Sequence, residues 1–325
     1  MIAATALTTL PATFRLPLGE GAEAVVDWLT NALSGLFAII RTIFQGMYEG
    51  VYWVLETPPI WAILIVVVAI AFFAKGWKLA VGSLIGFLII VGVNQWENAM
   101  ATLALVLVAS LLAILFSIPL GIWAAKSDAA SSAIKPVLDF MQTMPAFVYL
   151  IPALILFRVG VVPGIVATII FAMAPGVRMT ELGIRGVDKE VVEAGRAFGA
   201  TPGRILRQIQ LPLAMPSIMA GVNQVIMLAL SMVVIAGMVG AGGLGAAVVQ
   251  SLNRIDVALG FEAGISVVIL AMFLDRVTAA FAGQKRRVPS FLRSKRTKQR
   301  EAAGDVEQVD TKSTPTRAPV TAGTA

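Results

Sequence analysis

Long apolar runs separated by short polar stretches occupy the middle of the chain, and they predict helices that cross a membrane about seven times. One crossing needs roughly 20 apolar residues. The predicted spans are residues 61–73, 79–93, 99–125, 137–157, 163–177, 215–239 and 262–281. The first two and the fifth are short for a crossing, and the first two could instead pair as a re-entrant hairpin. The pattern therefore predicts an all-α fold, a polytopic transmembrane helical bundle.

Residues 22–55 have a different pattern, because apolar side chains recur there at helical spacing with polar ones between them. Trp28, Leu36 and Ile40 belong to the apolar set, and Asp27 and Arg41 fall between its members. This pattern indicates an amphipathic helix that lies on a membrane surface or packs on the bundle. We therefore divide the chain into an N-terminal outside segment (1–58), two additional spans (59–98) and a main transmembrane domain (99–283).

The placement of basic residues predicts the orientation of the spans. Residues 285–300 are rich in Lys and Arg, and cytoplasmic segments carry an excess of both. Counting back through seven crossings places 178–212, 126–135 and 75–78 inside and the N-terminus outside. Single basic residues at Arg158 and Arg254 are exceptions. The net charge of +6 thus follows membrane orientation rather than nucleic-acid binding, and 284–325 is expected to be a basic, then disordered, cytoplasmic tail.

Composition narrows the chemistry that the chain can perform. Apolar residues make up 58% of it and charged residues 14%, whereas soluble domains have about a quarter charged. Cys and His are absent, which removes thiol nucleophiles and Cys/His zinc sites. The glycine-rich run 240–245 is not followed by Lys-Ser/Thr, so we expect a flexible or re-entrant outside loop rather than a phosphate cradle. We predict no enzyme activity, no metal and no cofactor.

Residues 178–212 interrupt the apolar pattern and are too polar to cross. Asp188 can cap a first helix, and Gly199 is placed to end it. Thr201 followed by Pro202 is typical of the start of a second helix, which we expect Leu211–Pro212 to end. The pattern predicts a compact helix–turn–helix on the cytoplasmic side.

The same segment carries a signature. Glu193, Ala194 and Gly195 are followed after three residues by Gly199, and after nine more by Ile209, Leu211 and Pro212. This spacing resembles the EAA signature of ABC importer membrane subunits, E-A-A, three residues, G, nine residues, I-x-L-P. Gly195 departs from it where Ala is common. Residues 141–157, 163–175 and 210–245 are also similar to the permeases of glycine betaine/proline betaine importers, over roughly 99–281.

The resemblance implies a type I importer permease fold in the cytoplasmic (inner) cell membrane. It further implies a homodimer, two cytoplasmic ATP-binding subunits that hydrolyse ATP, and an outside solute-binding protein. Coupling to the ATPase would fall to Glu193, Ala194, Gly195, Phe198, Gly199, Ile209, Leu211 and Pro212. An apolar face of Val191, Val192 and Phe198 would seat in a groove of the ATPase.

Glycine betaine or proline betaine is the solute that the resemblance favours, with choline, carnitine or proline as alternatives. A different class, the ion-coupled secondary transporter, would need carboxylates deep in the membrane and inverted repeats. The sequence shows neither. Among polar residues at membrane depth we single out Gln142 and Asn223 as candidates for the translocation path. The alternative for each is a hydrogen bond between helices.

Overall fold

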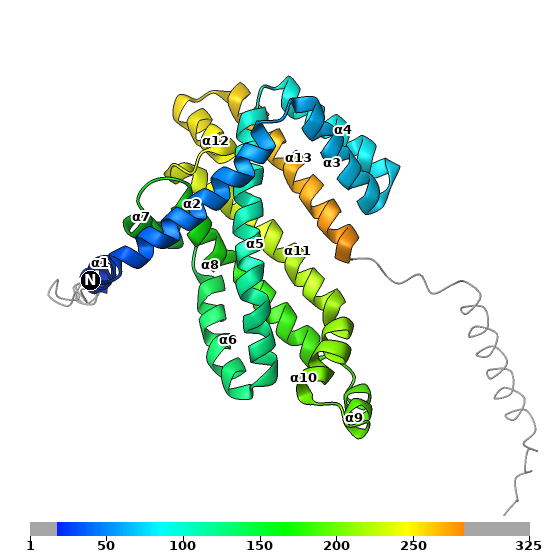
Figure 1. Cartoon of the computed structure of the whole chain (residues 1–325). Helices are drawn as coiled ribbons and strands as arrows, with labels where there is room; N and C mark the ends of the chain where they lie inside the picture. The colour runs from blue at the N-terminus through cyan, green and yellow to red at the C-terminus, as the bar shows by residue number, and fades with distance from the viewer. Residues whose placement is uncertain (1–17, 283–325) are drawn as a thin grey trace, which may run out of the picture. The chain divides into compact units, whose positions relative to one another are not determined.

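The computed structural model describes residues 18–282, and this part of the chain is helical without strands (Figure 1). The all-α prediction is confirmed for these residues, whereas the predicted tail 284–325 lies outside them. The elements in chain order are α1 (Leu18–Ala32), α2 (Ser34–Glu56), α3 (Ile60–Lys75), α4 (Trp77–Gly92), α5 (Trp96–Lys126), α6 (Asp128–Thr143), α7 (Ala146–Phe157), α8 (Val161–Arg185), α9 (Lys189–Ala197), α10 (Pro202–Ile205), the π-helical η1 (Leu206–Gln210), α11 (Leu211–Ala236), the 3-10 turn η2 (Gly237–Val239), α12 (Gly243–Arg254) and α13 (Val257–Ala282).

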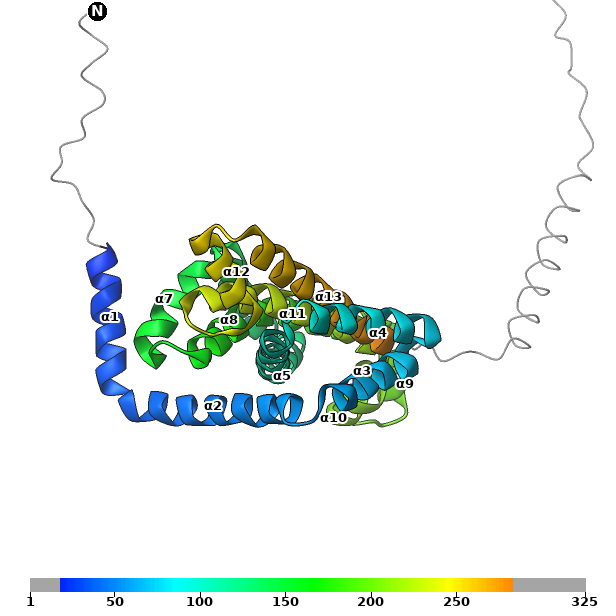
Figure 2. The ribbon, with the colours of Figure 1, turned by 90° about the horizontal axis from the view of Figure 1, so that it is seen from above.

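Three long helices, α5, α8 and α11, form the centre of the bundle. Met100, Ile165 and Met232, one from each helix, are fully buried. The helices approach closely because small residues stand where they cross. A β-carbon at Gly121 of α5 would lie 2.5 Å from Thr180 Cβ, and one at Gly176 of α8 would lie 2.5 Å from Ser117 Oγ. Seen from above, α5 lies between α2 and α11 (Figure 2).

The described helices support a chain that crosses a membrane several times. Four continuous stretches are long and apolar enough to span: α5, α8, the run Pro202–Val239, and α13. Two bent pairs, α1 with α2 and α6 with α7, raise the number to six if each pair is one span. Helices α3 and α4 have 16 residues each, shorter than the usual crossing. A polytopic bundle is therefore confirmed, while the count of seven stays a prediction.

The region predicted as a polar loop (126–135) and one span (137–157) folds differently. Helix α6 already begins at Asp128, because Ser127 Oγ accepts a hydrogen bond from the Ala130 N–H at 3.2 Å. The helix stops before Pro145, and α7 leaves at 99° to it. A residue that precedes proline avoids the helical region, and Met144 is extended. The predicted loop at 126–135 is therefore helical from Asp128, and the predicted span 137–157 is bent at Pro145.

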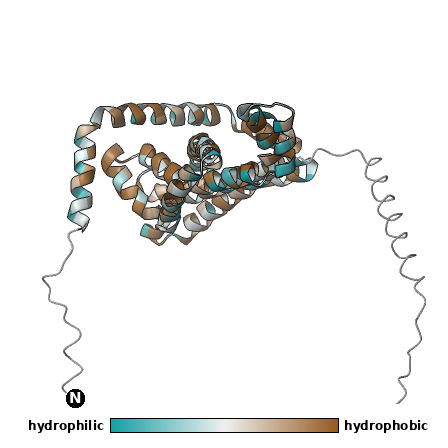
Figure 3. Ribbon diagram, turned by 90° about the horizontal axis from the view of Figure 1, so that it is seen from below, coloured by the Kyte–Doolittle hydropathy of each residue, from teal (hydrophilic) through white to brown (hydrophobic). Residues whose placement is uncertain are grey.

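Two further boundaries differ from the prediction. The span expected over 163–177 continues as α8 to Arg185, since its polar residues find partners on α6. The single N-terminal helix expected over 22–55 is two helices, α1 and α2, which meet at Leu33. Along α2, Phe44 and Tyr48 pack against the bundle while Ile39 and Ile43 are exposed. Apolar residues thus lie on both faces of this helix (Figure 3).

Candidate coupling site

Helix α9 stands at one end of the bundle beside α10 and carries the first half of the signature (Figure 1). Asp188 Oδ1 accepts a hydrogen bond from the Glu190 N–H at 3.0 Å, which caps the helix start. The helix ends at Gly199, whose φ of 76° is left-handed. The Ala200 N–H donates to Gly195 O at 3.1 Å and the Gly199 N–H to Arg196 O at 2.9 Å, the Schellman pattern. Both predicted caps are confirmed.

The second helix begins as predicted but does not end at Leu211–Pro212. Thr201 is the extended residue before α10, and Pro202 follows in the first helical turn, although the Thr201 side chain makes no capping bond. The chain then continues through η1 into α11. In η1 the Leu211 N–H reaches Leu206 O, a bond across five residues that makes room for a proline without an N–H. The second helix is therefore continuous with a long central helix.

Gly195 and Ile209, which are 14 positions apart in the signature, meet in the structure. A β-carbon at Gly195 would lie 2.6 Å from Ile209 Cδ1 and 3.6 Å from Ile205 Cγ1. The missing side chain thus lets α9 rest on η1. Val192 packs against a small separate cluster of buried residues, Ile184, Val187, Leu206, Ala214 and Ile218. Helix α9 is in this way fixed to the ends of α8 and α11.

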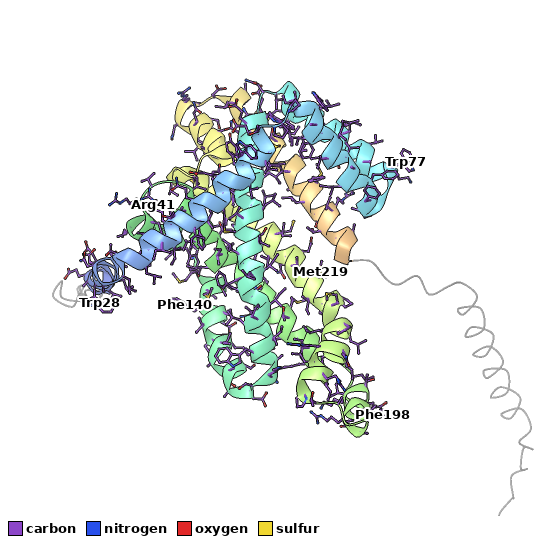
Figure 4. All side chains as sticks on the ribbon, in the orientation of Figure 1. Trp28, Arg41, Trp77, Phe140, Phe198 and Met219 are labelled. Carbon is purple, nitrogen blue, oxygen red and sulfur yellow. The ribbon has the colours of Figure 1, made fainter. Side chains whose placement is uncertain are left out.

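The outer side of α9 carries apolar side chains that nothing in the described chain covers. Phe198 is 92% exposed and projects from the end of the molecule (Figure 4). Val191, Glu193 and Ala194 are exposed as well. The predicted apolar face is therefore divided, since Val192 packs on its own protein. Val191 and Phe198 remain available to a partner.

A cluster of charged side chains joins α8 to α6 just before α9 begins. Glu181 on α8 has a side chain only 7% exposed. Its Oε1 lies 3.0 Å from Arg185 Nε and 3.4 Å from Lys135 Nζ, and it accepts a hydrogen bond from Ser131 Oγ at 2.6 Å. A buried carboxylate with three partners is well satisfied.

Arg185 extends the cluster to the end of α5. Its guanidinium pairs with Asp128 Oδ1 at 2.6 Å and donates to Ala124 O at 2.8 Å. Arg178, two helical turns before Arg185 on α8, pairs with Asp139 of α6. Sequence reasoning missed this cluster. The available signal was a Glu and an Arg four residues apart at the polar end of a predicted span.

The two candidate path residues lie in different surroundings. Gln142 is exposed near the end of α6, before the break at Pro145. Asn223 is half-buried on α11, where its Nδ2 donates to Asp275 Oδ1 at 3.2 Å and its Oδ1 accepts a hydrogen bond from Thr278. These are contacts between helices, the alternative noted above. A role of either residue in the path stays a prediction.

The glycine-rich run 240–245 is packed against the central helices. Leu244 is fully buried, and its N–H donates to Thr102 Oγ1 of α5 at 2.8 Å. A β-carbon at Gly245 would lie 2.3 Å from Val234 O, so this glycine permits close contact with α11. The run is thus a tightly packed turn into α12, which does not fit the flexible loop, and the re-entrant alternative stays a prediction.

Comparison with known proteins now adds to this geometry. Residues 117–287 match the family described as the binding-protein-dependent transport system inner membrane component. The chain belongs to this family. The prediction made from the EAA signature is therefore confirmed.

The matches to known permeases cover most of this chain and most of each relative. It is 50% identical over 270 residues to the glycine betaine/carnitine transport permease protein of Listeria monocytogenes, a match that covers 82% of this chain and 95% of the relative. It is 45% identical over 271 residues to the glycine betaine/proline betaine transport system permease protein of Escherichia coli, covering 83% and 77%. A 270-residue match is longer than the stretch from Ala99 to the C-terminus. The likeness therefore extends into the region before Ala99, beyond the expected 99–281.

A solved structure supports the fold of the permease. The MetNI methionine ABC transporter, in an inward-facing conformation, matches with a TM-score of 0.54 at 22% identity. The match covers 58% of this chain and 94% of that one. It shows that this chain has an importer permease fold.

Proposed function

We propose that this permease forms the membrane pathway of an ATP-driven importer for glycine betaine or proline betaine. The solute assignment is supported by the 50% identity, over 82% of the chain, to a permease named for glycine betaine and carnitine. That relative also transports carnitine by its name, so carnitine is an alternative. Choline and proline stay alternatives as well.

The proposed assembly has two copies of the permease, two cytoplasmic ATP-binding subunits and an outside solute-binding protein. Helix α9 is the proposed docking element for the ATPase. In support of this role, Phe198 and Val191 are apolar and uncovered, while Gly195 and Val192 fix the helix to its own bundle. An apolar side chain that seats in a groove of a partner is a common anchor. Glu193 and Arg196 would then set the register of α9 by charge pairing at the rim.

In the proposed mechanism, α9 transmits the closure of the ATPase pair to the spans. Movement of α9 pushes on η1. Because η1 continues into α11 without a flexible joint, α11 moves as well. The ion cluster of Glu181 carries the same displacement from α8 to α6. The bundle would then switch between inward-open and outward-open arrangements. The coupling residues act on motion and do not touch the solute.

The proposed topology has seven crossings in the cytoplasmic (inner) membrane, with the N-terminus outside and the C-terminus inside. It places α9 in the cytoplasm and α12 outside. Gln142 and Asn223 remain the proposed polar contacts of the path. No ATP is hydrolysed by this chain in the proposal, since ATP hydrolysis belongs to the partner subunit.

The decisive experiment reconstitutes the permease in liposomes with its ATP-binding subunit and its solute-binding protein. We expect uptake of radiolabelled glycine betaine that requires ATP on the ATPase side and stops without the binding protein. Competition by carnitine, choline and proline ranks the alternatives. Uptake driven by an ion gradient without ATP would instead support a secondary transporter and contradict the proposal.

A further inference from the structure

Helices α3 and α4 form a hairpin at the periphery of the bundle, joined by a single residue. That residue is Gly76, with a φ of 89°. Figure 1 shows the hairpin beside α13. Ile63 and Val67 of α3 and Phe87 of α4 belong to the main buried core. The outer side of the hairpin is apolar and exposed, as expected where lipid is the surrounding solvent.

The tip of the hairpin combines aromatic and basic side chains. Phe73 and Trp77 are largely exposed, and Lys75 and Lys78 are their neighbours in the sequence. Figure 4 shows Trp77 at this tip. Exposed aromatic rings with neighbouring lysines are typical of the boundary between hydrocarbon and lipid headgroups. The tip therefore indicates the level at which phosphate groups of the bilayer lie.

A slot opens between α4 and α13 next to this tip. Its volume is about 200 Å³. Its lining is mostly apolar: Leu79, Gly82, Ser83, Gly86, Ile269, Met272, Phe273 and Arg276. The exposed side chains of Ile85 and Met272 flank it, so it faces lipid. A compact ligand of drug size needs about 300–1,000 Å³. The slot is more suitable for a segment of an acyl chain.

The two helices run antiparallel along the slot, and this sets its polarity. A β-carbon at Gly86 would lie 2.8 Å from Ile269 Cγ2, so the helices touch at one end. Seven residues away on each helix, Leu79 and Arg276 line the other end. That distance is two helical turns, about 10 Å. Arg276 and Lys78 therefore stand at the end of the slot near the hairpin tip.

Three cations at this end have no carboxylate partner within the described residues. Lys75, Lys78 and Arg276 form no salt bridge there, and all three are exposed. Deeper in the slot, the Ser83 hydroxyl is buried and has no hydrogen-bond partner in the described chain. A buried polar atom without a partner is costly. Both observations indicate a ligand that brings a negative charge and, further in, an acceptor atom.

We infer that this slot binds one anionic phospholipid. Its phosphate contacts Arg276 and Lys78, a glycerol ester carbonyl accepts a hydrogen bond from Ser83, and one acyl chain lies along Gly82 and Phe273. Ser83 is five residues beyond Lys78, about 7.5 Å along the helix axis, where the ester groups lie inside the phosphate level. Clustered cations at the cytoplasmic surface favour anionic lipid. The site is independent of the solute and the ATPase.

The test counts the lipids that stay bound to the purified full chain. The protein is solubilised in mild detergent with equal amounts of phosphatidylglycerol and phosphatidylcholine, and native mass spectrometry counts each lipid. We expect one phosphatidylglycerol per chain in clear preference to phosphatidylcholine. The Lys78→Gln/Arg276→Gln double variant should lose that preference roughly tenfold or more.

Two glycine variants separate the slot from the general surface. A β-carbon at Gly82 meets nothing within 4 Å, so Gly82→Trp places a large side chain at the slot without a clash at its β-carbon. Gly92, on the same helix, is equally unobstructed but does not line the slot. Gly82→Trp should lose the bound lipid, and Gly92→Trp should keep it.

Three results would overturn the inference. One is a wild-type chain without preference for the anionic lipid. Another is equal lipid retention by the Gly82→Trp and Gly92→Trp variants. The third is a change in oligomeric mass, rather than in lipid count, on Gly82→Trp, since it would mean that a second copy occupies the slot. If Gly82→Trp does not fold, the double charge variant decides.

Discussion

Single residues of the signature act by different physical means. Gly195 acts through space, because a β-carbon there would lie 2.6 Å from Ile209 Cδ1. Gly199 has free space around it and is needed for its left-handed φ of 76°. The close atom is the far end of a flexible side chain, so an alanine at 195, as in the signature, needs only a shift of Ile209. A side chain at 199 is strained whatever its size.

The first prediction concerns Gly199. We expect Gly199→Leu to uncouple ATP hydrolysis from uptake in the reconstituted importer, because about 1–2 kcal/mol of backbone strain opens the turn that holds α9. Gly203→Leu is the control, since Gly203 lies four residues away in α10, has open space and has no left-handed φ. Uptake per ATP is the quantity measured. An unchanged ratio in Gly199→Leu would argue against the docking role of α9.

The second prediction compares a buried and an exposed carboxylate. Glu181→Ala should lower the free energy of unfolding by about 1–3 kcal/mol, since Ser131 would lose a buried hydrogen-bond partner and the partly exposed Arg185 and Lys135 would lose their common carboxylate. Asp139→Ala, which removes a pair with a 64% exposed side chain, should cost at most about 1 kcal/mol. Thermal unfolding of both variants in detergent measures the difference. Equal losses would mean that Glu181 does not organise the cluster.

The local caps of α9 could be predicted from the sequence, and the ion cluster could not. Asp188 and Gly199 act on atoms within a few positions of themselves, so their residue types reveal their roles. Glu181 and Lys135 are 46 positions apart, and Asp128 pairs with Arg185 across 57. No local pattern selects those partners. They meet because α6 folds back along α8, and no local sequence pattern reveals that packing.

At the scale of elements, proline was an ambiguous signal. Pro119, Pro175 and Pro216 lie inside continuous helices, yet the chain breaks before Pro145. Neighbouring helices can satisfy the backbone groups that an internal proline frees, so its residue type alone does not decide the outcome. Pro212 is the clearest case. We expected it to end a helix, and η1 instead carries the helix through it.

The third prediction tests η1 as a rigid connection. Deleting both Arg207 and Gln208 should remove the extra residue of this π-helical segment and one further helical residue, which rotates α9 by about 100° relative to α11. The fold of the spans should persist while solute uptake stops and ATP hydrolysis continues. Gln208→Ala keeps the segment length and should transport normally. Full uptake by the deletion variant would show that the orientation of α9 does not matter.

At the scale of the whole molecule, the orientation of the bundle in the membrane can be tested by labelling its two ends from one side. The chain has no cysteine, so single cysteines can be placed without removing native ones. Lys189 on α9 and Val257, 81% exposed at the start of α13, lie on the two ends of the long helices. They are suitable reporters for the two sides of the membrane.

The last prediction uses these positions with a membrane-impermeant maleimide. Val257→Cys should react in spheroplasts, whereas Lys189→Cys and Lys78→Cys should react only after permeabilisation, because a charged reagent does not cross the bilayer. Glu20→Cys should react from outside if the chain crosses seven times. Reaction of Glu20→Cys only after permeabilisation would mean that α2 also crosses, since an additional span moves the N-terminus to the other side. Reaction of Lys189→Cys from outside would invert the bundle and contradict docking of α9 on a cytoplasmic ATPase.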